Sequence, residues 1–483
     1  MIVQGKTQKW ELVIGLEIHA QLNSRTKLFS CSSTNFNQDN NQQVSYIDAA
    51  MPGMLPRMNK RCVELAVKAG LGLNGKINKF SMFDRKNYFY PDSPQGYQIS
   101  QFFFPIVSEA SLEIRGDNGE KKTIAINRIH IEQDAGKSVH DRSETETLID
   151  LNRAGIPLIE IVTDPDFSSP QEIEQFIKKL RNILRYIDVC DGDLEKGSMR
   201  CDANISVRKV GDLSLGKRVE IKNLNSFKHI NKAIIYEAKR QINLLENSQH
   251  VIQETRSFNT DSGETKLIRV KENAEDYRYF PDPDLLPLRI SEEFIKSIQK
   301  TIPELPEDKK IRYMKEFSLT SYDAEVLIEN KNVSKFFEKV VGQGINPKVA
   351  SNWICAELFG KLNKKGIEFS DIPLSAKNFG SLINAIINNK ISGRIAKDIL
   401  EIMLQKDEDP ETIIKSYNLS QISSEKDIEK YVDLVINSNP NKVEEYKSGK
   451  TKLFAFFVGQ VMKASKGKAN PQRVNEILEK KLY

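Results

Sequence analysis

Long apolar runs are absent from this sequence, although a transmembrane helix needs about 20 consecutive apolar residues. The apolar stretch near the start, in MIVQGKTQKWELVIGLEIHAQL, is interrupted by Glu17 and His19 and offers no small-residue cleavage site. We therefore expect no secretory signal, no membrane association and a cytoplasmic location.

Cysteine is scarce as well. The five cysteines form no Cys-x-x-Cys pair, and an odd count without an export signal argues against a disulfide framework. A zinc site needs a closer grouping of Cys and His than these residues provide. We expect reduced thiols and no zinc.

Net charge is small, +5 over 483 residues, which is too weak to indicate a nucleic-acid partner by itself. Its distribution is uneven. From Lys447 to Lys481 the chain has nine Lys and Arg against two Glu, so this segment carries +7 and the remainder is slightly acidic. Taken alone, a basic helical tail is more often a solvated surface than a binding site.

The local pattern changes near residue 290. Before it, short alternating segments between Gly, Pro and Asp predict strands and turns, whereas segments such as SYDAEVLIEN, with Ser321 as N-cap, predict helices after it. A chain of this length exceeds one core. We predict an α+β protein with three domains: an antiparallel β-rich domain (1–290), an all-helical domain (291–406) and a small basic helical tail domain (407–483).

Several predicted strands alternate apolar residues with residues that bind metals or phosphate. In VIGLEIHAQL, Glu17 and His19 point to one face and the Ile, Leu and Ala residues to the other. The same alternation in INRIHIEQD, RCDANISVR and RVEIKN places these residues on polar faces: Arg128, His130, Glu132, Asp134, Arg200, Asp202, Asn204, Ser206, Arg208, Glu220 and Lys222.

Two interpretations of these faces are open. A sheet with one face on a core and the other in water produces the same alternation without any function. However, Glu160 lies inside the apolar run IPLIEIV, where a buried carboxylate needs a partner or a metal. Carboxylates without paired cysteines suit a hard cation such as Mg²⁺, which commonly bridges carboxylates to substrate phosphates.

Phosphate binding has two candidate segments. DAGKS (134–138) ends like a Walker A loop, but that motif requires glycine at the position of Ile131, so it is not a P-loop. DRKNYFYPD (84–92) supplies Lys86, a compact charge suited to a transferring phosphoryl group. A surface turn with the aromatic residues 88–90 anchored in the core is an equal alternative.

Taken together, these segments resemble the B subunit family of the aspartyl/glutamyl-tRNA(Asn/Gln) amidotransferases, in family order and over nearly the whole chain. The resemblance rests on VIGLEIHAQL (13–22), FDRKNYFYPDSPQGYQISQ (83–101), IHIEQDAGKS (129–138), DLNRAGIPLIEIV (150–162), EKGSMRCDANISVR (195–208), VEIKNLNSF (219–227) and DYRYFPDPDLLPL (276–288). Such long segments are far more specific than a lone glycine motif.

The resemblance implies a reaction that uses ATP and Mg²⁺ as cofactors. The side-chain carboxylate of Glu on tRNA(Gln), or of Asp on tRNA(Asn), becomes an acyl phosphate, and ammonia then displaces phosphate. The family fold is an N-terminal cradle domain, a helical domain and a small tail domain. The chain shows neither an amidase loop nor a Cys-His glutaminase pattern. The implied partners are therefore a glutaminase A subunit that supplies ammonia and a small C subunit, in a heterotrimer.

The resemblance also implies roles for particular residues. Metal ligands are expected at Glu17, His19, Glu132, Asp202 and Glu220. Catalytic roles are expected for Lys86, Glu132 and Glu220, and contacts to the nucleotide for Lys86, Arg200 and Lys222. Contacts to the tRNA backbone are expected from Lys447, Lys450, Lys452, Lys463, Lys466, Lys468 and Arg473.

The sequence departs from the family pattern at two places. Some members carry a zinc-binding cysteine cluster near the start, whereas this chain retains Cys31 without the expected partners. Many members have two consecutive glutamates where this chain has Glu132 and Gln133, so a ligand assigned to the second would be lost. Of these two positions, we expect Glu132 to be the metal ligand because it shares a face with His130.

Two other functions compete with this interpretation. One is a non-catalytic tRNA-binding adaptor, but stacked carboxylates near RNA would repel phosphate unless a metal intervened. The other is a metal-dependent hydrolase using His19 or His130 as a base, for which we find no matching motif.

Overall fold

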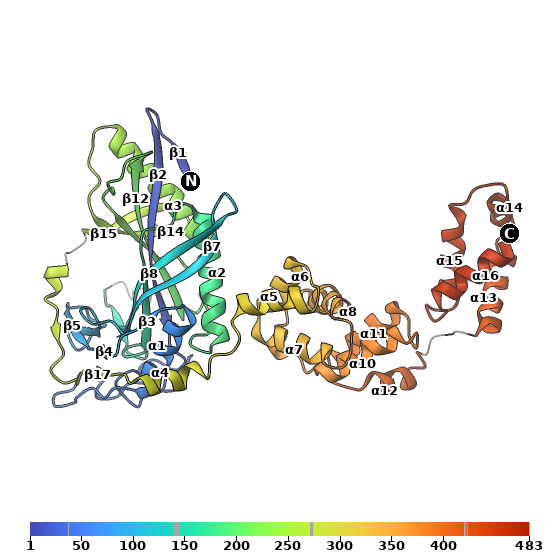
Figure 1. The fold of residues 1–483 in the computed structure, drawn as a ribbon, viewed down its shortest axis with the longest axis horizontal. Coiled ribbons are helices and arrows are strands. Elements are labelled where there is room, and N and C mark those ends of the chain that lie inside the picture. Colours follow the sequence, from blue (N-terminus) through green and yellow to red (C-terminus); the bar gives the residue numbers. More distant parts are fainter. Residues whose placement is uncertain (37, 140–144, 271–273, 420–421, 423, 483) are drawn as a thin grey trace. The chain divides into compact units, whose positions relative to one another are not determined.

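A computed structural model describes all residues except 37, 140–144, 271–273, 420–421, 423 and 483. The chain divides into two compact units, Met1–Leu305 and Pro306–Tyr483 (Figure 1). The first unit has one hydrophobic core, and the second has two, one from Tyr313 to Ile414 and one from Ile428 to Leu482. We keep the finer division at 290 and 406 as a prediction. Among the described residues, no helix combines the length and apolar content needed to cross a membrane.

A ten-stranded sheet is the centre of the first unit. Its order is β15-β14-β13-β12-β2-β11-β8-β7-β3, with β1 (Ile2–Gln4) paired to β2 off this path. The other strands are β2 (Lys9–Gln21), β3 (Lys76–Ile77), β7 (Val107–Arg115), β8 (Lys121–Gln133), β11 (Pro157–Thr163), β12 (Met199–Lys209), β13 (Val219–Lys222), β14 (Glu254–Asn259) and β15 (Glu264–Val270). Neighbouring strands are antiparallel except β13 and β14, which are parallel.

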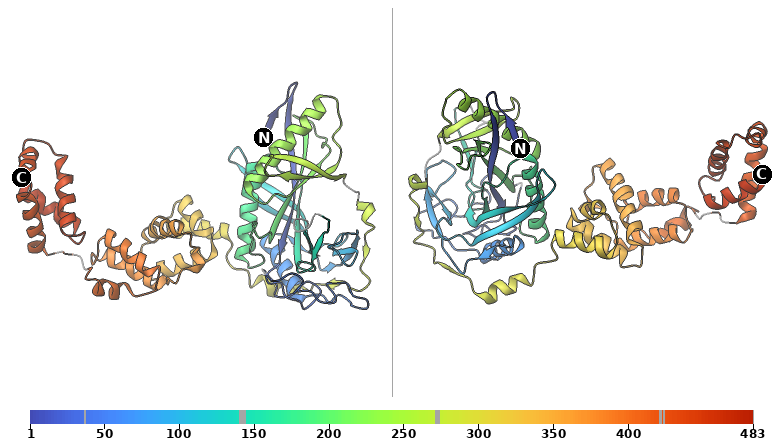
Figure 2. Two further views of the ribbon diagram at one scale, coloured as in Figure 1. Left: turned by 180° about the vertical axis from the view of Figure 1, so that it is seen from behind. Right: turned by 45° about the horizontal axis from the view of Figure 1, so that its top comes forward.

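Helices cover the apolar face of this sheet. The helix α2 (Pro170–Tyr186) starts at the N-cap Ser169, which accepts from the Glu172 amide, and its buried apolar side chains join the core together with the apolar residues of β2. The helix α3 (Phe227–Glu246) packs on β12 and β15, and α1 (Lys60–Gly72) on β7 and β8. Figure 2 shows α2 and α3 in front of the strands. We expected mainly strands and turns before residue 290, and this expectation is wrong for these helices. Their buried apolar residues recur with a helical spacing of 3.6 residues.

Small sheets flank the large one. A three-stranded sheet of β16 (Phe280–Pro281), β5 (Asp84–Asn87) and β6 (Tyr97–Ser100) lies against the end of β8, where Gln98 Nε2 donates to the Gln133 carbonyl at 2.8 Å. Two further pairs are β4 (Phe80–Ser81) with β17 (Leu288–Arg289) and β9 (Lys137–Val139) with β10 (Leu148–Asp150). The three-stranded sheet carries Lys86 toward the main sheet.

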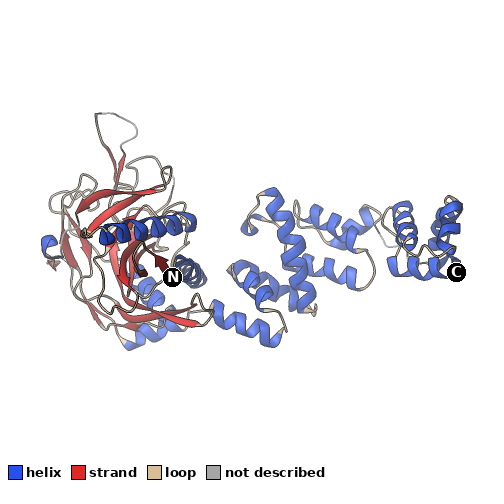
Figure 3. Ribbon diagram, turned by 90° about the horizontal axis from the view of Figure 1, so that it is seen from above, coloured by secondary structure: helices blue, strands red, loops and turns tan. Residues whose placement is uncertain are grey.

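Among the described residues, the second unit consists of helices joined by loops, with one isolated β-bridge between Ile422 and Ala469 (Figure 3). The first unit ends with the 3₁₀ turn Ala274–Tyr277 and α4 (Glu292–Gln299). The second unit contains α5 (Pro306–Glu316), α6 (Ser321–Ile328), α7 (Lys331–Val341), α8 (Pro347–Asn352), the π-helix Trp353–Leu358, α9 (Phe359–Lys365), the 3₁₀ helix Phe369–Asp371, α10 (Ala376–Ile387), α11 (Gly393–Met403), α12 (Pro410–Ser416), α13 (Glu425–Asn437), α14 (Pro440–Lys447), α15 (Leu453–Ala464) and α16 (Pro471–Leu482).

The predicted α+β class is confirmed: strands form the sheet-containing first unit and helices the second. One helix start was wrong by a residue. The N-cap of α6 is Thr320, whose side chain accepts from the Asp323 amide, and Ser321 is already helical. Both residue types cap helices well, so the sequence alone did not separate them.

Candidate functional site

The pairing register lines up the predicted polar residues across one face of the large sheet. Glu160 of β11 pairs with His19 of β2 on one side and with His130 of β8 on the other, and Arg200 of β12 pairs with His19. Residues directly opposite each other point to the same face. These four side chains therefore form one polar row across four strands.

Two more rows lie beside it. In the first, Glu17 pairs with Asp202, which lies opposite Lys222 in the continued register of β12 and β13. In the second, Asn204 pairs with Glu220. The side chains predicted from the sequence to share faces on separate strands thus meet on a single face, opposite the helices.

The first cluster joins two imidazoles and two carboxylates. His19 Nε2 lies 3.4 Å from Glu132 Oε1 and 3.3 Å from Glu160 Oε2. His130 Nε2 lies 3.5 Å from Glu132 Oε2 and 3.4 Å from Glu160 Oε2. Ser100 Oγ of β6 also donates to Glu132, at 3.3 Å. Glu160 was expected to be substantially buried and partnered; its side chain is 14% exposed and has both histidines as partners.

Ion pairing shifts the pKa values of this cluster. Burial lowers the pKa of His130, but Glu160 and Glu132 outweigh it and raise that pKa to about 9. The pKa of His19 is likewise raised well above its usual value, because the same carboxylates oppose the effect of burial. Burial and Glu160 raise the pKa of Glu132, but the two histidines lower it to about 2. The ion pairs thus favour the imidazolium form of the histidines and the carboxylate form of Glu132.

A second cluster is centred on Lys222. Its Nζ lies 2.6 Å from Asp202 Oδ2 and 3.1 Å from Glu220 Oε1. The pKa of Lys222 is raised, because these two carboxylates outweigh burial. Thr255 of β14 fixes the other oxygen of Glu220, since Thr255 Oγ1 donates to Glu220 Oε2 at 2.8 Å. The ammonium group thus takes a position between two predicted metal ligands.

Two further predicted residues of the face, Glu17 and Arg200, also have polar partners. Asn204 Nδ2 donates to Glu17 Oε1 at 2.9 Å. Arg200 Nη2 donates to Asp134 Oδ2 at 2.7 Å, and its pKa is raised because Asp134 outweighs burial. Arg200 and Lys222, predicted to contact nucleotide, are held by carboxylates in this structure.

Lys86 extends from β5 over the first cluster. Its Nζ lies 4.9 Å from the ring centre of Tyr277. Burial lowers the pKa of Lys86, but Tyr279, Glu132 and Glu160 outweigh it and raise that pKa overall, so the ammonium lies within electrostatic reach of these carboxylates. The alternative of aromatics anchored in the core is wrong, because Phe89 is 88% exposed and Tyr90 50%.

One group of side chains fits a divalent cation. His19, Glu132 and Glu160 each offer a ligand atom, and these atoms lie within 4.8 Å of one another. Two carboxylates and one imidazole are an appropriate donor set, although Mg²⁺ favours oxygen over nitrogen. Of the five predicted ligands, the structure thus brings His19 and Glu132 together and places Glu17, Asp202 and Glu220 in the neighbouring rows.

Two residues of the first cluster were missing from the predicted set. The sequence could have indicated Glu160, because it is a carboxylate inside an apolar run. It could also have indicated His130, because His130 shares a strand face with Glu132. His130 Nδ1 is buried and has no hydrogen-bond partner among the described residues. Their proximity depends on the register of β11 with β2 and β8, which local sequence does not reveal.

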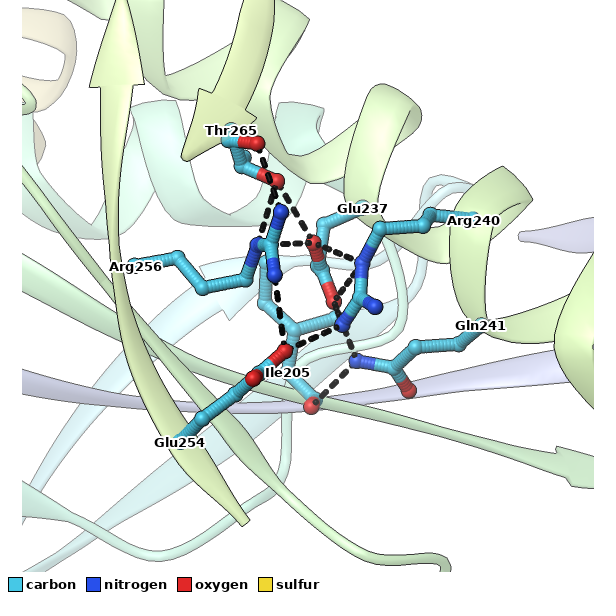
Figure 4. A network of polar contacts seen from close by, with 7 residues as sticks. All are labelled: Ile205, Glu237, Arg240, Gln241, Glu254, Arg256 and Thr265. Carbon is cyan, nitrogen blue, oxygen red and sulfur yellow. Dashed lines mark hydrogen bonds and ion pairs between the residues drawn. The ribbon is translucent and has the colours of Figure 1, made fainter. Parts of the chain in front are cut away.

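The opposite face of the sheet carries a different polar network (Figure 4). Glu237 of α3 is fully buried and receives bonds from Arg240 at 2.7 Å and from Thr265 at 2.9 Å. Glu254 lies 3.0 Å from Arg240 and 2.8 Å from Arg256. These Arg–carboxylate pairs join α3 to β14 and β15.

The basic tail presents most of its predicted cations to solvent. Lys468 is half-buried, and its Nζ donates to the Asn418 carbonyl at 2.6 Å. Lys450 pairs with Glu445 at 2.9 Å and Arg473 with Glu476 at 3.1 Å. The exposed residues of the set are Lys447, Lys450, Lys452, Lys463, Lys466 and Arg473.

Comparison with known proteins covers both units. The family model of the GatB/GatE catalytic domain matches residues 12–296, and that of the GatB domain matches residues 335–482. The B subunit of an aspartyl/glutamyl-tRNA(Asn/Gln) amidotransferase from Rickettsia rickettsii (strain Sheila Smith) is 58% identical over 480 residues, 99% of each chain. The corresponding protein of Rickettsia prowazekii (strain Madrid E) is 57% identical over 480 residues, again 99% of each chain. The chain belongs to the GatB family.

Proposed function

We propose that this protein catalyses the ATP-dependent step of a tRNA transamidation. A side-chain carboxylate oxygen of Glu on tRNA(Gln), or of Asp on tRNA(Asn), attacks the γ-phosphorus of ATP, and ADP leaves. Ammonia then attacks the acyl carbon, phosphate leaves with the C–O electron pair, and a proton is lost, which gives Gln-tRNA(Gln) or Asn-tRNA(Asn). The names of the relatives, subunits of an aspartyl/glutamyl-tRNA amidotransferase, support this proposal.

The observation that carries the proposal is the shared polar face. Three strands bring the carboxylates of Glu132, Glu160 and Glu17 to the same side, and Lys86 covers them from the three-stranded sheet. Both substrates are anions, so the reaction requires cations that bring them together. The same carboxylates count against the alternative of a passive tRNA adaptor, because they would repel RNA phosphates.

His19, Glu132 and Glu160 would hold a divalent cation, since their ligand atoms already converge. When bound, Mg²⁺ offsets the negative charge of carboxylate and phosphate during phosphoryl transfer. Lys86 would bind the transferring phosphoryl group. Binding of a metal requires His19 to lose the proton that its raised pKa retains, so cation affinity should increase with pH.

The ammonia has to come from elsewhere. We propose a glutaminase A subunit as its source and a small C subunit that completes a heterotrimer, in line with the names of the relatives, which describe one subunit of a larger enzyme. The exposed cations of the tail would contact the tRNA backbone and hold the substrate through salt-sensitive interactions.

An assay with labelled ATP and Glu-tRNA(Gln) tests the proposal in the complex with the partner subunits. We expect ADP formation to depend on the aminoacyl-tRNA, and Glu220→Ala to abolish both ADP and amide formation. Glu113→Ala is the matched control, because Glu113 is an exposed carboxylate on β7 of the same sheet. If Glu220→Ala formed ADP and amide at the wild-type rate, the role of Glu220 would be refuted.

A further inference from the structure

The outer strand β15 contains an irregularity opposite β14. Arg256 of β14 pairs with Leu267, but the preceding residue of β14, Thr255, pairs with Arg269. Ile268 is therefore an extra residue, a β-bulge. In regular pairing Ile268 would lie opposite Thr255, and Arg269 would point to the face covered by α3.

The bulge reverses that arrangement. Because side chains alternate along a strand, one extra residue moves every later side chain to the other face. Arg269 thus extends the row of Asn204, Glu220 and Thr255 on the polar face. Two strand spacings, about 10 Å, separate its backbone from that of Glu220. Bulges that redirect a side chain are common next to active sites.

The side chain of Arg269 meets the same residue as Lys86. Arg269 Nη2 donates to the Tyr277 hydroxyl at 3.4 Å, and Lys86 Nζ lies 4.9 Å from the Tyr277 ring centre. Asn87, next to Lys86, donates to the Tyr277 carbonyl at 3.1 Å and so ties this residue to β5. Tyr277 therefore brings together two cations from strands of two different sheets.

Arg256, on the neighbouring strand β14, lies on the other face of the sheet. Arg256 points to the opposite face, where Thr265 Oγ1 accepts from it at 2.9 Å and Glu254 lies 2.8 Å away. Two arginines at one sheet edge are thus divided between the two faces, and the bulge decides which one reaches the site. A guanidinium recognises oxyanions through paired N–H donors, which suits phosphate.

We propose that Arg269 binds phosphate oxygens at the site, next to Tyr277, whose ring also lies close to Lys86. The inference rests on the proposed function, since that function brings phosphate to this face. The phosphate belongs either to ATP or to the terminal nucleotides of the aminoacyl-tRNA. The guanidinium of Arg269 keeps its positive charge at every physiological pH.

Kinetics of Arg269→Ala in the complex with the partner subunits test the proposal. We expect the KM for one of the two substrates to increase at least about tenfold, because a hydrogen-bonded charge pair is lost. An increase for ATP, accompanied by weaker Mg-ATP binding in equilibrium dialysis, identifies the nucleotide, and an increase for aminoacyl-tRNA identifies the tRNA phosphate. Arg115→Ala, which removes an exposed arginine at the end of β7, is the charge-matched control.

Unchanged KM values for both substrates, relative to Arg115→Ala, would overturn the proposal. Should Arg269→Ala fail to fold, Arg269→Lys keeps the charge and the alkyl stem but loses the planar fork, and we expect it to raise the same KM several-fold; an unchanged KM there would equally overturn the proposal. Failure of the proposed function itself is distinct, because the wild type would then form no ADP with aminoacyl-tRNA. Failure of this inference alone leaves wild-type turnover and the loss in Glu220→Ala intact.

Discussion

The two faces of one sheet carry two charged networks of opposite design. On the helix face, Glu237 and Glu254 are paired with the guanidinium groups of Arg240 and Arg256. On the polar face opposite the helices, here called the open face, Glu132 and Glu160 are paired with imidazoles. Asp202 and Glu220 are paired with an ammonium group. The carboxylates are similar, but the cations differ.

That difference separates a structural network from a chemical one. Arginine stays protonated at every physiological pH and holds carboxylates in a fixed, planar geometry. Imidazolium loses its proton readily, and the resulting neutral nitrogen binds metals. The helix-face network therefore fixes α3 against the sheet, whereas in the proposed function a metal ion would replace the proton of His19 beside Glu132 and Glu160.

The largest expected effect concerns activity alone. Lys86→Ala should reduce tRNA-dependent ADP formation roughly 10²- to 10³-fold, the cost of removing one group that stabilises transition-state charge. The urea unfolding midpoint should change little. Lys121→Ala, an exposed lysine on β8, is the control and should behave as wild type. Wild-type activity in Lys86→Ala would place the chemistry elsewhere.

On the helix face we expect a substitution to reduce stability. Glu237→Ala removes the fully buried carboxylate that two arginines share and leaves them with Glu254 alone, so it should reduce the free energy of unfolding by about 3 kcal/mol, measured by urea denaturation. Glu325→Ala removes an exposed ion pair with Lys310 and should cost less than about 1 kcal/mol. Equal effects of the two substitutions would contradict the structural role of the network.

A matched pair of threonines sharpens the comparison. Thr255 donates to Glu220 on the open face, and Thr265 donates to Glu237 on the helix face; both are buried. Each Thr→Val substitution removes one hydrogen bond to a carboxylate, worth about 1.5 kcal/mol. We expect Thr255→Val to lower ADP formation about tenfold, and Thr265→Val to lower the unfolding free energy while leaving kcat unchanged. The opposite assignment of effects would refute the division of roles.

A further expected effect is a pH dependence of stability. Burial lowers the pKa of His130, but its carboxylate partners raise it to about 9 from the ordinary 6.5. The ion pairs of protonated His130 with its carboxylate partners therefore stabilise the fold fully below pH 6.5. This stabilisation is lost as the pH rises toward about 9. Urea unfolding of the metal-free protein across this range should show that decline. His130→Gln should flatten it, and an identical slope in both proteins would contradict the ion pairing.

The sequence predicted the open face better than the contacts on it. Strict alternation in β2, β8 and β12 was enough to assign Glu17, His19, Glu132 and Asp202 to polar faces. It could not show that Glu160 lies between His19 and His130, because register between distant strands depends on the whole sheet. Alternation also fails at β15, where the bulge redirects Arg269.

For the fold too, features set by local sequence could be predicted, whereas contacts between distant segments could not. The helical second unit was predictable from its periodicity. The pairing of Lys222 with Asp202 and Glu220 was not, since the residues are brought together by β12 and β13. Lys222 was expected at a nucleotide, and the structure holds it between two expected metal ligands.

The central claim, that this protein converts a tRNA-bound carboxylate into an acyl phosphate, is tested most directly by trapping that intermediate. Hydroxylamine replaces ammonia in an assay of the complex with ATP and Glu-tRNA(Gln), because it converts an acyl phosphate into a stable hydroxamate. We predict one γ-hydroxamate on tRNA-bound glutamate for each ADP formed, and both products reduced roughly 10²- to 10³-fold with Lys86→Ala. Hydroxylamine also cleaves the aminoacyl ester and releases an α-hydroxamate without ATP, so the γ-hydroxamate is measured separately. γ-Hydroxamate formed without consumption of ATP would contradict the account.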